Sequence, residues 1–515
     1  MRHFAIACCL ALIIQGCATL KPYPDSSLSD EDGTCQHWFE TIEATLDEYD
    51  LNDPETVRIN GFPHLRVDRF LASMAERTTS TEAFAEWLEQ MRQLDLIAKK
   101  FEFANLPSSA MQQLVSNIPI EGSFEQALEH CGKRLNQLSL NNPEHKQRLL
   151  EQAQVPDAYQ SWKRVAGLYP LARYAAAIAI EQLHRDLDAS FQIPLEKLPQ
   201  QGTLIRYSPP HSDPLPSERI AAMLKSAYDN PLGIPQLTSL QLQQLLEHFA
   251  PAWEIDTRND TDKIGAAVLD SDKQPRIDIN QPTTYVTHGY ARWHGRVVLQ
   301  LIYQIWLPAR EKTGMLDLYG GPLDSLIWRV TLDPEGMPIA FDTIHACGCY
   351  YLLFPSQGYR VIPPKDGAEP VLSPKSIATI SPDQHLLLRL QSRTHYLQQV
   401  SSVDDTSRGY MFQDLEQLRS LPMPNGSKRS LYDRDGIIDA SERAERFLLW
   451  PYGIASPGAM RQWGTHAIAF IGRRHFDDPF LLENLLTRND LSGLSELSIQ
   501  NGGECFPHFL ITPNS

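Results

Sequence analysis

The sequence predicts an α+β protein, in which a helical amino-terminal domain is followed by a mainly antiparallel sheet domain with late helices packed against it. Apolar residues recur at helical spacing up to about residue 248, whereas short β-rich runs separated by turn residues follow from about residue 252. The chain has 515 residues, 42% of them hydrophobic, and this composition is typical of a globular protein with a large core. The formal net charge of −17 argues against nucleic acid as a partner, since that would require a basic surface.

The first segment, 1–16, has the composition of a removable signal peptide. A short basic start precedes an apolar stretch, 4–14, which is shorter than the roughly 20 residues that a membrane-spanning helix needs. Residues 14–17, Ile-Gln-Gly-Cys, resemble the lipobox of bacterial prolipoproteins. The resemblance implies cleavage before Cys17 and lipidation of Cys17; the alternative is an ordinary secretory signal with a chance cysteine.

The second segment, 17–34, is rich in proline, serine and acidic residues, which is typical of a solvated tether. Ala18 follows the cysteine, where an aspartate would resemble the inner-membrane retention signal of Gram-negative lipoproteins. The resemblance therefore implies a protein anchored to the outer membrane through lipid on Cys17, with its body in the periplasm.

A helical domain is expected over 35–192. Phe84, Trp87, Leu88 and Met91 recur at helical spacing, and 168–183 is rich in alanine. The next segment, 193–251, is expected to be a proline-rich linker followed by helices, because six prolines fall within 193–217.

Five cysteines follow the lipidation site: Cys35, Cys131, Cys347, Cys349 and Cys505. An oxidising compartment favours disulfides. Cys35 and Cys131 bracket a helical segment without another cysteine, so we expect them to pair. Cys505 could then pair with Cys347 or Cys349, which leaves one thiol over.

A β-rich α+β domain is expected over 252–515. Its predicted strands are 264–269, 276–279, 283–290, 297–307, 325–332, 337–344 and 386–390. Asp333-Pro334-Glu335-Gly336 is a turn sequence that predicts an antiparallel hairpin. Helices are expected to return at 412–421, 441–449 and 479–486.

The stretch 283–307 alternates with a period of two and is too long for one usual strand, so we expect a turn near Trp293-His294-Gly295. One parity is polar and contains Tyr290, Arg292 and Arg296, which are candidate ligand-binding residues. The alternative is a merely solvated face of the sheet.

A metal site is one interpretation of the cluster His345-Ala346-Cys347-Gly348-Cys349. Imidazole and thiolate suit Zn or Cu, and His288 or His294 would complete the ligand set of His345, Cys347 and Cys349. The alternative is one cysteine in a disulfide and the other buried.

A third cluster lies at 473–477. His475 and Asp477 are candidate catalytic residues, as a carboxylate–imidazole couple, and Arg473 and Arg474 could hold an anionic ligand. The alternative is a network of ion pairs in a loop.

Two functional hypotheses remain. The body is similar to uncharacterised envelope lipoproteins of proteobacteria. The first hypothesis is a non-catalytic lipoprotein whose helical domain and polar sheet face bind an envelope protein or a small ligand. The alternative is a metal-dependent periplasmic hydrolase or oxidoreductase that uses the His and Cys residues above.

Overall fold

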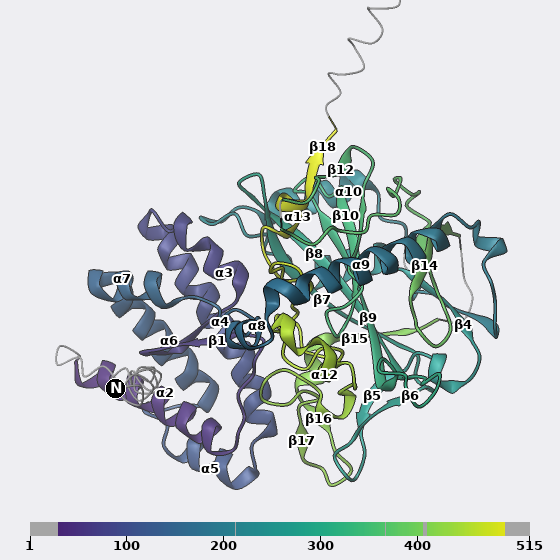
Figure 1. Ribbon diagram of the computed structural model, residues 1–515. Coiled ribbons are helices and arrows are strands. Elements are labelled where there is room, and N and C mark those ends of the chain that lie inside the picture. Colours follow the sequence, from purple (N-terminus) through teal and green to yellow (C-terminus); the bar gives the residue numbers. More distant parts are fainter. Residues whose placement is uncertain (1–28, 212, 366, 405–408, 490–515) are drawn as a thin grey trace, which may run out of the picture. The chain divides into compact units, whose positions relative to one another are not determined.

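The computed structural model describes residues 29–489, apart from 212, 366 and 405–408, and Figure 1 shows its helices and strands. Cys17 and Cys505 lie outside the described residues. The chain divides between Val155 and Pro156 into two compact units. Unit 1 thus ends within the segment 35–192, which the sequence predicts to be one helical domain. In the described part of the chain, every helix is too short or too polar to cross a membrane.

Unit 1 is mainly helical. Its helices are α2 (Asp30–Glu48), α3 (Arg69–Met74), α4 (Thr81–Asn105), α5 (Ser108–Ser116), α6 (Phe124–Asn141) and α7 (Pro143–Gln152). Ser29, Ser80 and Ser123 begin three of these helices, because each hydroxyl accepts a hydrogen bond from a backbone amide of the first turn. A hairpin of β1 (Val57–Ile59) and β2 (Phe62–Val67) was not predicted.

The core of unit 1 contains the predicted disulfide. Cys35 on α2 is bonded to Cys131 on α6, with their Cα atoms 5.2 Å apart, so this prediction is confirmed. Both cysteines are buried among apolar side chains such as Trp38 and Phe39. Unit 1 also contains a buried ion pair, in which Arg66 donates hydrogen bonds to Glu102 at 2.8 Å and to Asp95 at 3.2 Å.

Unit 2 is built on a six-stranded sheet in the order β11-β10-β9-β8-β7-β15. The strands are β7 (Thr283–Trp293), β8 (Arg296–Arg310), β9 (Gly321–Leu332), β10 (Pro338–His345), β11 (Leu352–Pro355) and β15 (Met411–Asp414). Neighbours are antiparallel except β15 and β7, which are parallel.

Two predicted turns connect these strands. His294 and Gly295, both with positive φ, form the two-residue turn between β7 and β8, whose end residues Trp293 and Arg296 are paired. The Asp333–Gly336 turn joins β9 to β10, and the amide of Gly336 donates to the carbonyl of Asp333 at 2.9 Å.

Strand β8 of the six-stranded sheet is buried on both faces, which the sequence did not predict. On β8, Leu299 and Tyr303 lie in one apolar core, whereas Ile302 and Trp306 lie in another. The expected polar face is therefore largely interior along this strand.

A four-stranded sheet in the order β14-β13-β4-β3 completes unit 2. Its strands are β3 (Thr203–Tyr207), β4 (Ala252–Thr257), β13 (His385–Leu390) and β14 (Leu397–Val403). Three two-stranded sheets are smaller: β5 (Ala266–Leu269) with β6 (Pro275–Asp278), β12 (Tyr359–Val361) with β18 (Leu486–Arg488), and β16 (Leu421–Pro422) with β17 (Lys428–Arg429). Each predicted strand is thus present, with its ends shifted by a few residues.

The helices of unit 2 are α8 (Ser161–Ala166), α9 (Tyr169–Phe191), α10 (Ser217–Ala227), α11 (Ser239–His248), α12 (Arg446–Leu449) and α13 (Leu481–Leu485). Of the predicted late helices, 479–486 and the end of 441–449 are present as short helices. The prediction of a helix at 412–421 is wrong, because 411–414 pairs with β7 as β15 and only a short 3₁₀ helix follows.

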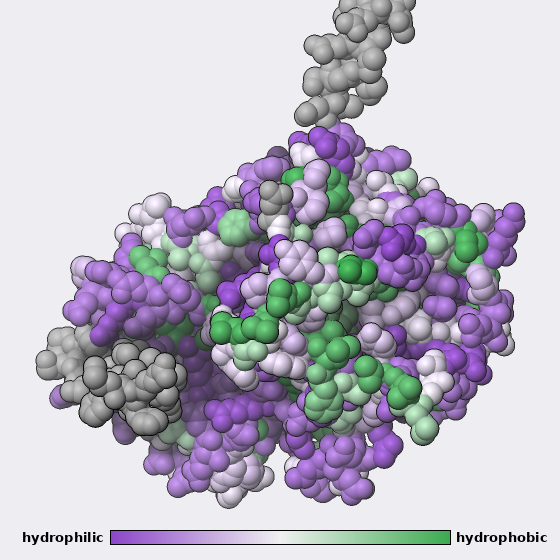
Figure 2. All heavy atoms as spheres, viewed as in Figure 1, coloured by the Kyte–Doolittle hydropathy of each residue, from purple (hydrophilic) through white to green (hydrophobic). Residues whose placement is uncertain are grey.

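One face of α8 and α9 is apolar and exposed. Apolar side chains gather along both helices and over α12 (Figure 2). Between 63% and 78% of each of the following residues is exposed: Trp162, Val165, Leu168, Leu171, Tyr174 and Ile178. The opposite face of α9 packs inward, through Ala176, Ile180 and Leu187.

Candidate functional site

A cavity of about 560 Å³ lies in unit 2, beneath the inward face of α9. Its wall is formed by α9, by the loop after β10 and by residues between 445 and 474. Gln182 and Leu448, which are exposed, also line it, so the cavity opens to solvent. Its volume is in the range that accommodates a small-molecule ligand, roughly 300–1,000 Å³.

The loop after β10 brings two thiols to this cavity. The amide of Gly348 donates to the carbonyl of His345 at 2.8 Å, and the amide of His345 donates to the carbonyl of Cys349 at 3.0 Å. Gly348 has a φ of +86°, and a Cβ there would lie 2.5 Å from the carbonyl oxygen of Ala467, so the turn requires glycine. Cys347 and Cys349 both line the cavity, and neither forms a disulfide within the described residues.

The two thiols interact with each other. The hydrogen bond from Cys349 lowers the pKa of Cys347, and the same hydrogen bond, together with burial, raises the pKa of Cys349. The buried guanidinium of Arg461 interacts electrostatically with both sulfurs. Cys347 is therefore the sulfur of the pair that more readily becomes a thiolate.

Glu445 is a buried carboxyl group of the same cavity. Burial raises the pKa of Glu445 to about 7, although Arg443 and Arg310 oppose the shift. Glu445 also interacts electrostatically with both thiols. A carboxyl group with this pKa exchanges protons near neutral pH, so it can act as either acid or base.

Tyrosines form another part of the wall. Tyr350 and Tyr396 line the cavity with their ring centroids 4.5 Å apart, and Tyr319 lines it as well. Arg310 donates hydrogen bonds to the hydroxyls of Tyr350 at 3.2 Å and Tyr396 at 3.1 Å. These contacts hold the rings of Tyr350, which follows Cys349 in the sequence, and of Tyr396 in place at the cavity wall.

A buried charge network lies behind the tyrosines. Asp324 contacts Nδ1 of His345 at 3.3 Å and Nδ1 of His395 at 2.7 Å. On its other side, Nε2 of His395 contacts Asp262 at 3.2 Å. Nε2 of His345 has no hydrogen-bond partner among the described residues, and its ring centroid lies 5.0 Å from that of Tyr350.

The charges of this network follow from its burial and contacts. Burial alone would lower the pKa of His395, but the hydrogen bonds and charges of Asp262 and Asp324 outweigh it and raise that pKa. Burial would raise the pKa of Asp324, but His345, His395 and Arg443 hold it well below its usual value. The two carboxylates on either side of His395 thus favour its protonated form.

The predicted metal ligands do not come together. His345 is buried at the end of β10, whereas His288 is exposed on β7 and His294 is exposed in the β7–β8 turn. Within the residues that the structure describes, no three His, Cys, Asp or Glu side chains form a group that could hold a metal ion. The described residues around Cys347 and Cys349 therefore do not form a ligand set for Zn or Cu.

The candidate ligand-binding residues of the sheet lie elsewhere. The hydroxyl of Tyr290 donates to the carbonyl of Pro235 at 3.0 Å, and buried Arg292 stacks on the ring of Phe480. Arg296 forms an exposed ion pair with Glu335. These three side chains make structural contacts and do not line the cavity.

The cluster at 473–477 is divided. His475 contacts Asp157 at 3.1 Å, and Arg473 forms an ion pair with the same carboxylate. The carboxylate partner of His475 is therefore Asp157, whereas the sequence predicts Asp477. Asp477 lies near Arg329 instead. Arg474 lines the cavity, so it is the one predicted ligand-binding residue that the structure places there.

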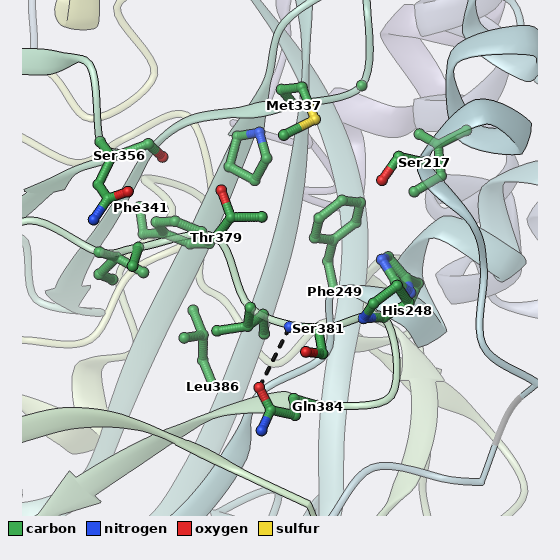
Figure 3. Close-up of a pocket in the computed structure, with 18 of the residues that line it drawn as sticks. Ser217, His248, Phe249, Met337, Phe341, Ser356, Thr379, Ser381, Gln384 and Leu386 are labelled. Carbon is green, nitrogen blue, oxygen red and sulfur yellow. Dashed lines mark hydrogen bonds between the residues drawn. The ribbon is translucent and has the colours of Figure 1, made fainter.

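A second cavity, of about 160 Å³, lies between the start of α10, the end of α11 and residues 377–386 (Figure 3). His248 and Ser217 line it on one side, and Ser381 and Gln384 on another, where the Ser381 amide donates to Gln384 at 3.3 Å. Burial and the neighbouring His385 lower the pKa of His248 to about 4. This space is smaller than most ligand sites.

No family model, curated protein or solved structure matches the chain. Sequence reasoning found Cys347, Cys349 and Arg474 but missed Glu445, Tyr396 and Asp324, which carry no local motif.

Proposed function

We propose that the chain is an outer-membrane lipoprotein that binds a small amphipathic ligand in the cavity beneath α9. The observation that carries this proposal is the cavity itself, which is open to solvent and large enough for a ligand. The metal-dependent alternative has no comparable support, because its ligands are not assembled.

The lining supports an amphipathic ligand. Apolar and aromatic side chains make up most of it, including Ile180, Leu183 and Phe470. Glu445 and Arg474 provide polar groups at separate points of the wall. A ligand with an apolar body and a polar end satisfies both kinds of surface.

Substitutions on α9 test the site. Ala177 and Ala179 are both exposed on α9, but only Ala179 lines the cavity. We expect Ala179→Trp to weaken binding of the probe 1-anilinonaphthalene-8-sulfonate roughly tenfold or more, since a tenfold change corresponds to about 1.4 kcal/mol. Ala177→Trp is the matched control, with binding within about twofold of the parent chain.

Isothermal titration calorimetry of the full chain provides the readout. Equal affinities for the two variants would contradict the cavity as the binding site. They would point instead to the exposed apolar face of α8 and α9.

The anchoring is tested separately. We expect the chain to incorporate radiolabelled palmitate and to fractionate with outer membranes, and Cys17→Ala to abolish both. Cys9→Ala, in the expected signal peptide, is the control and should retain both properties. Labelling that survives Cys17→Ala would overturn the lipoprotein proposal.

A further inference from the structure

The thiol turn at 347–349 has features that ligand binding alone does not explain. Two cysteines separated by one residue line an open cavity, hydrogen-bonded to each other. The glycine between them adopts a conformation that other residues rarely adopt. A buried carboxyl group, Glu445, and a buried cation, Arg461, interact with both sulfurs.

We propose that Cys347 and Cys349 form a reversible dithiol–disulfide pair that exchanges with the disulfide of a small molecule entering the cavity. Glu445 serves as the proton acceptor of the pair. This inference deepens the proposed function, since it assigns the same cavity a redox-active ligand class.

The exchange has two steps. The thiolate of Cys347 attacks one sulfur of the incoming disulfide, whose other sulfur leaves as a thiolate and takes up the proton lost from Cys347. Cys349 then gives its proton to Glu445, and its sulfur attacks Cys347 in the mixed disulfide. The second thiol of the substrate is released with that proton. The protein loses two electrons and two protons, and the small disulfide gains them.

The neighbouring groups suit these steps. Cys347 is the sulfur whose pKa is lowered, so it is the better nucleophile of the two near neutral pH. The pKa of Glu445, about 7, allows it to accept a proton from a thiol and to release it again. Arg461 provides positive charge beside the sulfurs while either is a thiolate.

Mass spectrometry can follow the exchange in the full chain. Cys347 and Cys349 lie in one tryptic peptide, 330–360, and Cys505 lies in another, 489–515. The protein is reduced, incubated with oxidised glutathione over a range of redox ratios, alkylated and digested. We expect peptide 330–360 to become two hydrogens lighter and unalkylated, reversibly, while peptide 489–515 stays alkylated.

Two results would overturn the proposal. One is that both cysteines of peptide 330–360 remain alkylated at every redox ratio. The other is that this peptide is found cross-linked to 489–515, which would make Cys505 the partner. Repeating the titration with Cys505→Ser should leave the expected result unchanged.

Single variants assign the roles. Cys349→Ser should accumulate glutathione on Cys347, because the resolving thiol is absent, whereas Cys347→Ser should react far more slowly. Glu445→Gln should prolong the mixed disulfide by at least about tenfold without changing the final ratio of dithiol to disulfide. Glu442→Gln, whose carboxylate instead accepts from Ser456, is the control and should behave as the parent chain.

The two proposals fail in different ways. If Ala179→Trp leaves probe binding intact but the peptide still forms its disulfide, the ligand site is wrong and the redox pair stands. If probe binding is lost as expected and the peptide stays reduced, the redox pair is wrong and the ligand site stands.

Discussion

The two cysteine pairs of the chain differ in spacing and in surroundings. Cys35 and Cys131 are 96 residues apart and lie in the apolar core of unit 1. Cys347 and Cys349 are separated by one residue and lie at a cavity wall beside charged groups.

This difference separates a structural pair from a reactive one. Closing a long loop restricts the unfolded chain strongly, so the first pair stabilises the fold. A pair within a single turn restricts the unfolded chain little, and the hydrogen bond from Cys349 favours a thiolate at Cys347. Four kinds of variant follow in order of expected effect. The first tests this contrast directly, and the others compare the remaining stabilising contacts of the two units with it.

Removing the structural pair should have the largest effect. We expect Cys35→Ser/Cys131→Ser to lower the free energy of unfolding of unit 1 by about 5 kcal/mol, which is the loop-closure contribution for a loop of this length. Hydrogen exchange of peptides from α2 and α6, measured by mass spectrometry in urea, reports the loss.

The matched variant is Cys347→Ser/Cys349→Ser. It should change the free energy of unfolding of unit 2 by less than about 1 kcal/mol, since little loop entropy is involved. Equal losses in the two double variants would remove the distinction between the pairs.

The next largest loss of stability is expected when a buried ion pair is removed. Arg329 donates to both oxygens of Asp342, and Tyr351, which lines the cavity, donates to the same carboxylate at 3.1 Å. We expect Asp342→Asn to cost about 3 kcal/mol in unit 2, because it removes the charge of the carboxylate that accepts two hydrogen bonds from a buried guanidinium. Urea denaturation followed by tryptophan fluorescence measures it, and a loss below about 1 kcal/mol would show that the pair matters little.

The network behind the cavity predicts a pH dependence. The pKa of His395 is raised above 6.5 in the folded state, so its contribution to stability is fully present below pH 6.5 and is lost as the pH rises through the folded value. We expect His395→Gln to cost about 2 kcal/mol at pH 6, from hydrogen bonds to charged groups, and progressively less at higher pH.

The measurement is the difference in urea midpoint between His395→Gln and the parent chain from pH 6 to pH 9. A difference that grows with pH would contradict an imidazolium at this position. His294→Gln, in an exposed turn, is the control and should show a small, flat difference.

Helix caps should have the smallest effect, and a similar one in both units. Ser123 begins α6 and Thr238 begins α11, each with a reciprocal glutamine three residues on. We expect Ser123→Ala and Thr238→Ala each to lower the free energy of unfolding of its unit by about 1 kcal/mol, which thermal denaturation can detect. A much larger loss of stability for Ser123→Ala would mean that the Cys35–Cys131 disulfide forms only when the first turn of α6 is intact.

Much of the fold was predictable because its signals are local. The alternation along 283–307 and the turn residues at 294–295 and 333–336 predict the strands and turns that the structure contains. The segment 412–421 was not predictable, because pairing of 411–414 with β7 outweighs its local helical pattern.

The site was only half predictable, for a similar reason. Cys347 and Cys349 stand out because they occur together in the sequence. Asp324 and His395 are 71 residues apart and Glu445 is further along the chain, so only the folded structure brings Asp324 into contact with His395 and close enough to Glu445 to interact with it. The burial of β8 on both faces likewise depends on helices and loops that its own alternation does not reveal.

The six-stranded and four-stranded sheets of unit 2 differ in the sequence separation between their paired strands. This difference has a consequence for the order of folding. Strands β7 to β11 pair with successive neighbours through short connections, whereas β4 and β13 pair in parallel, with Glu254 and Arg389 being 135 residues apart. Distant pairing requires a larger loss of chain entropy before any contact forms. The antiparallel meander is therefore expected to form early in folding, and the four-stranded sheet to close late.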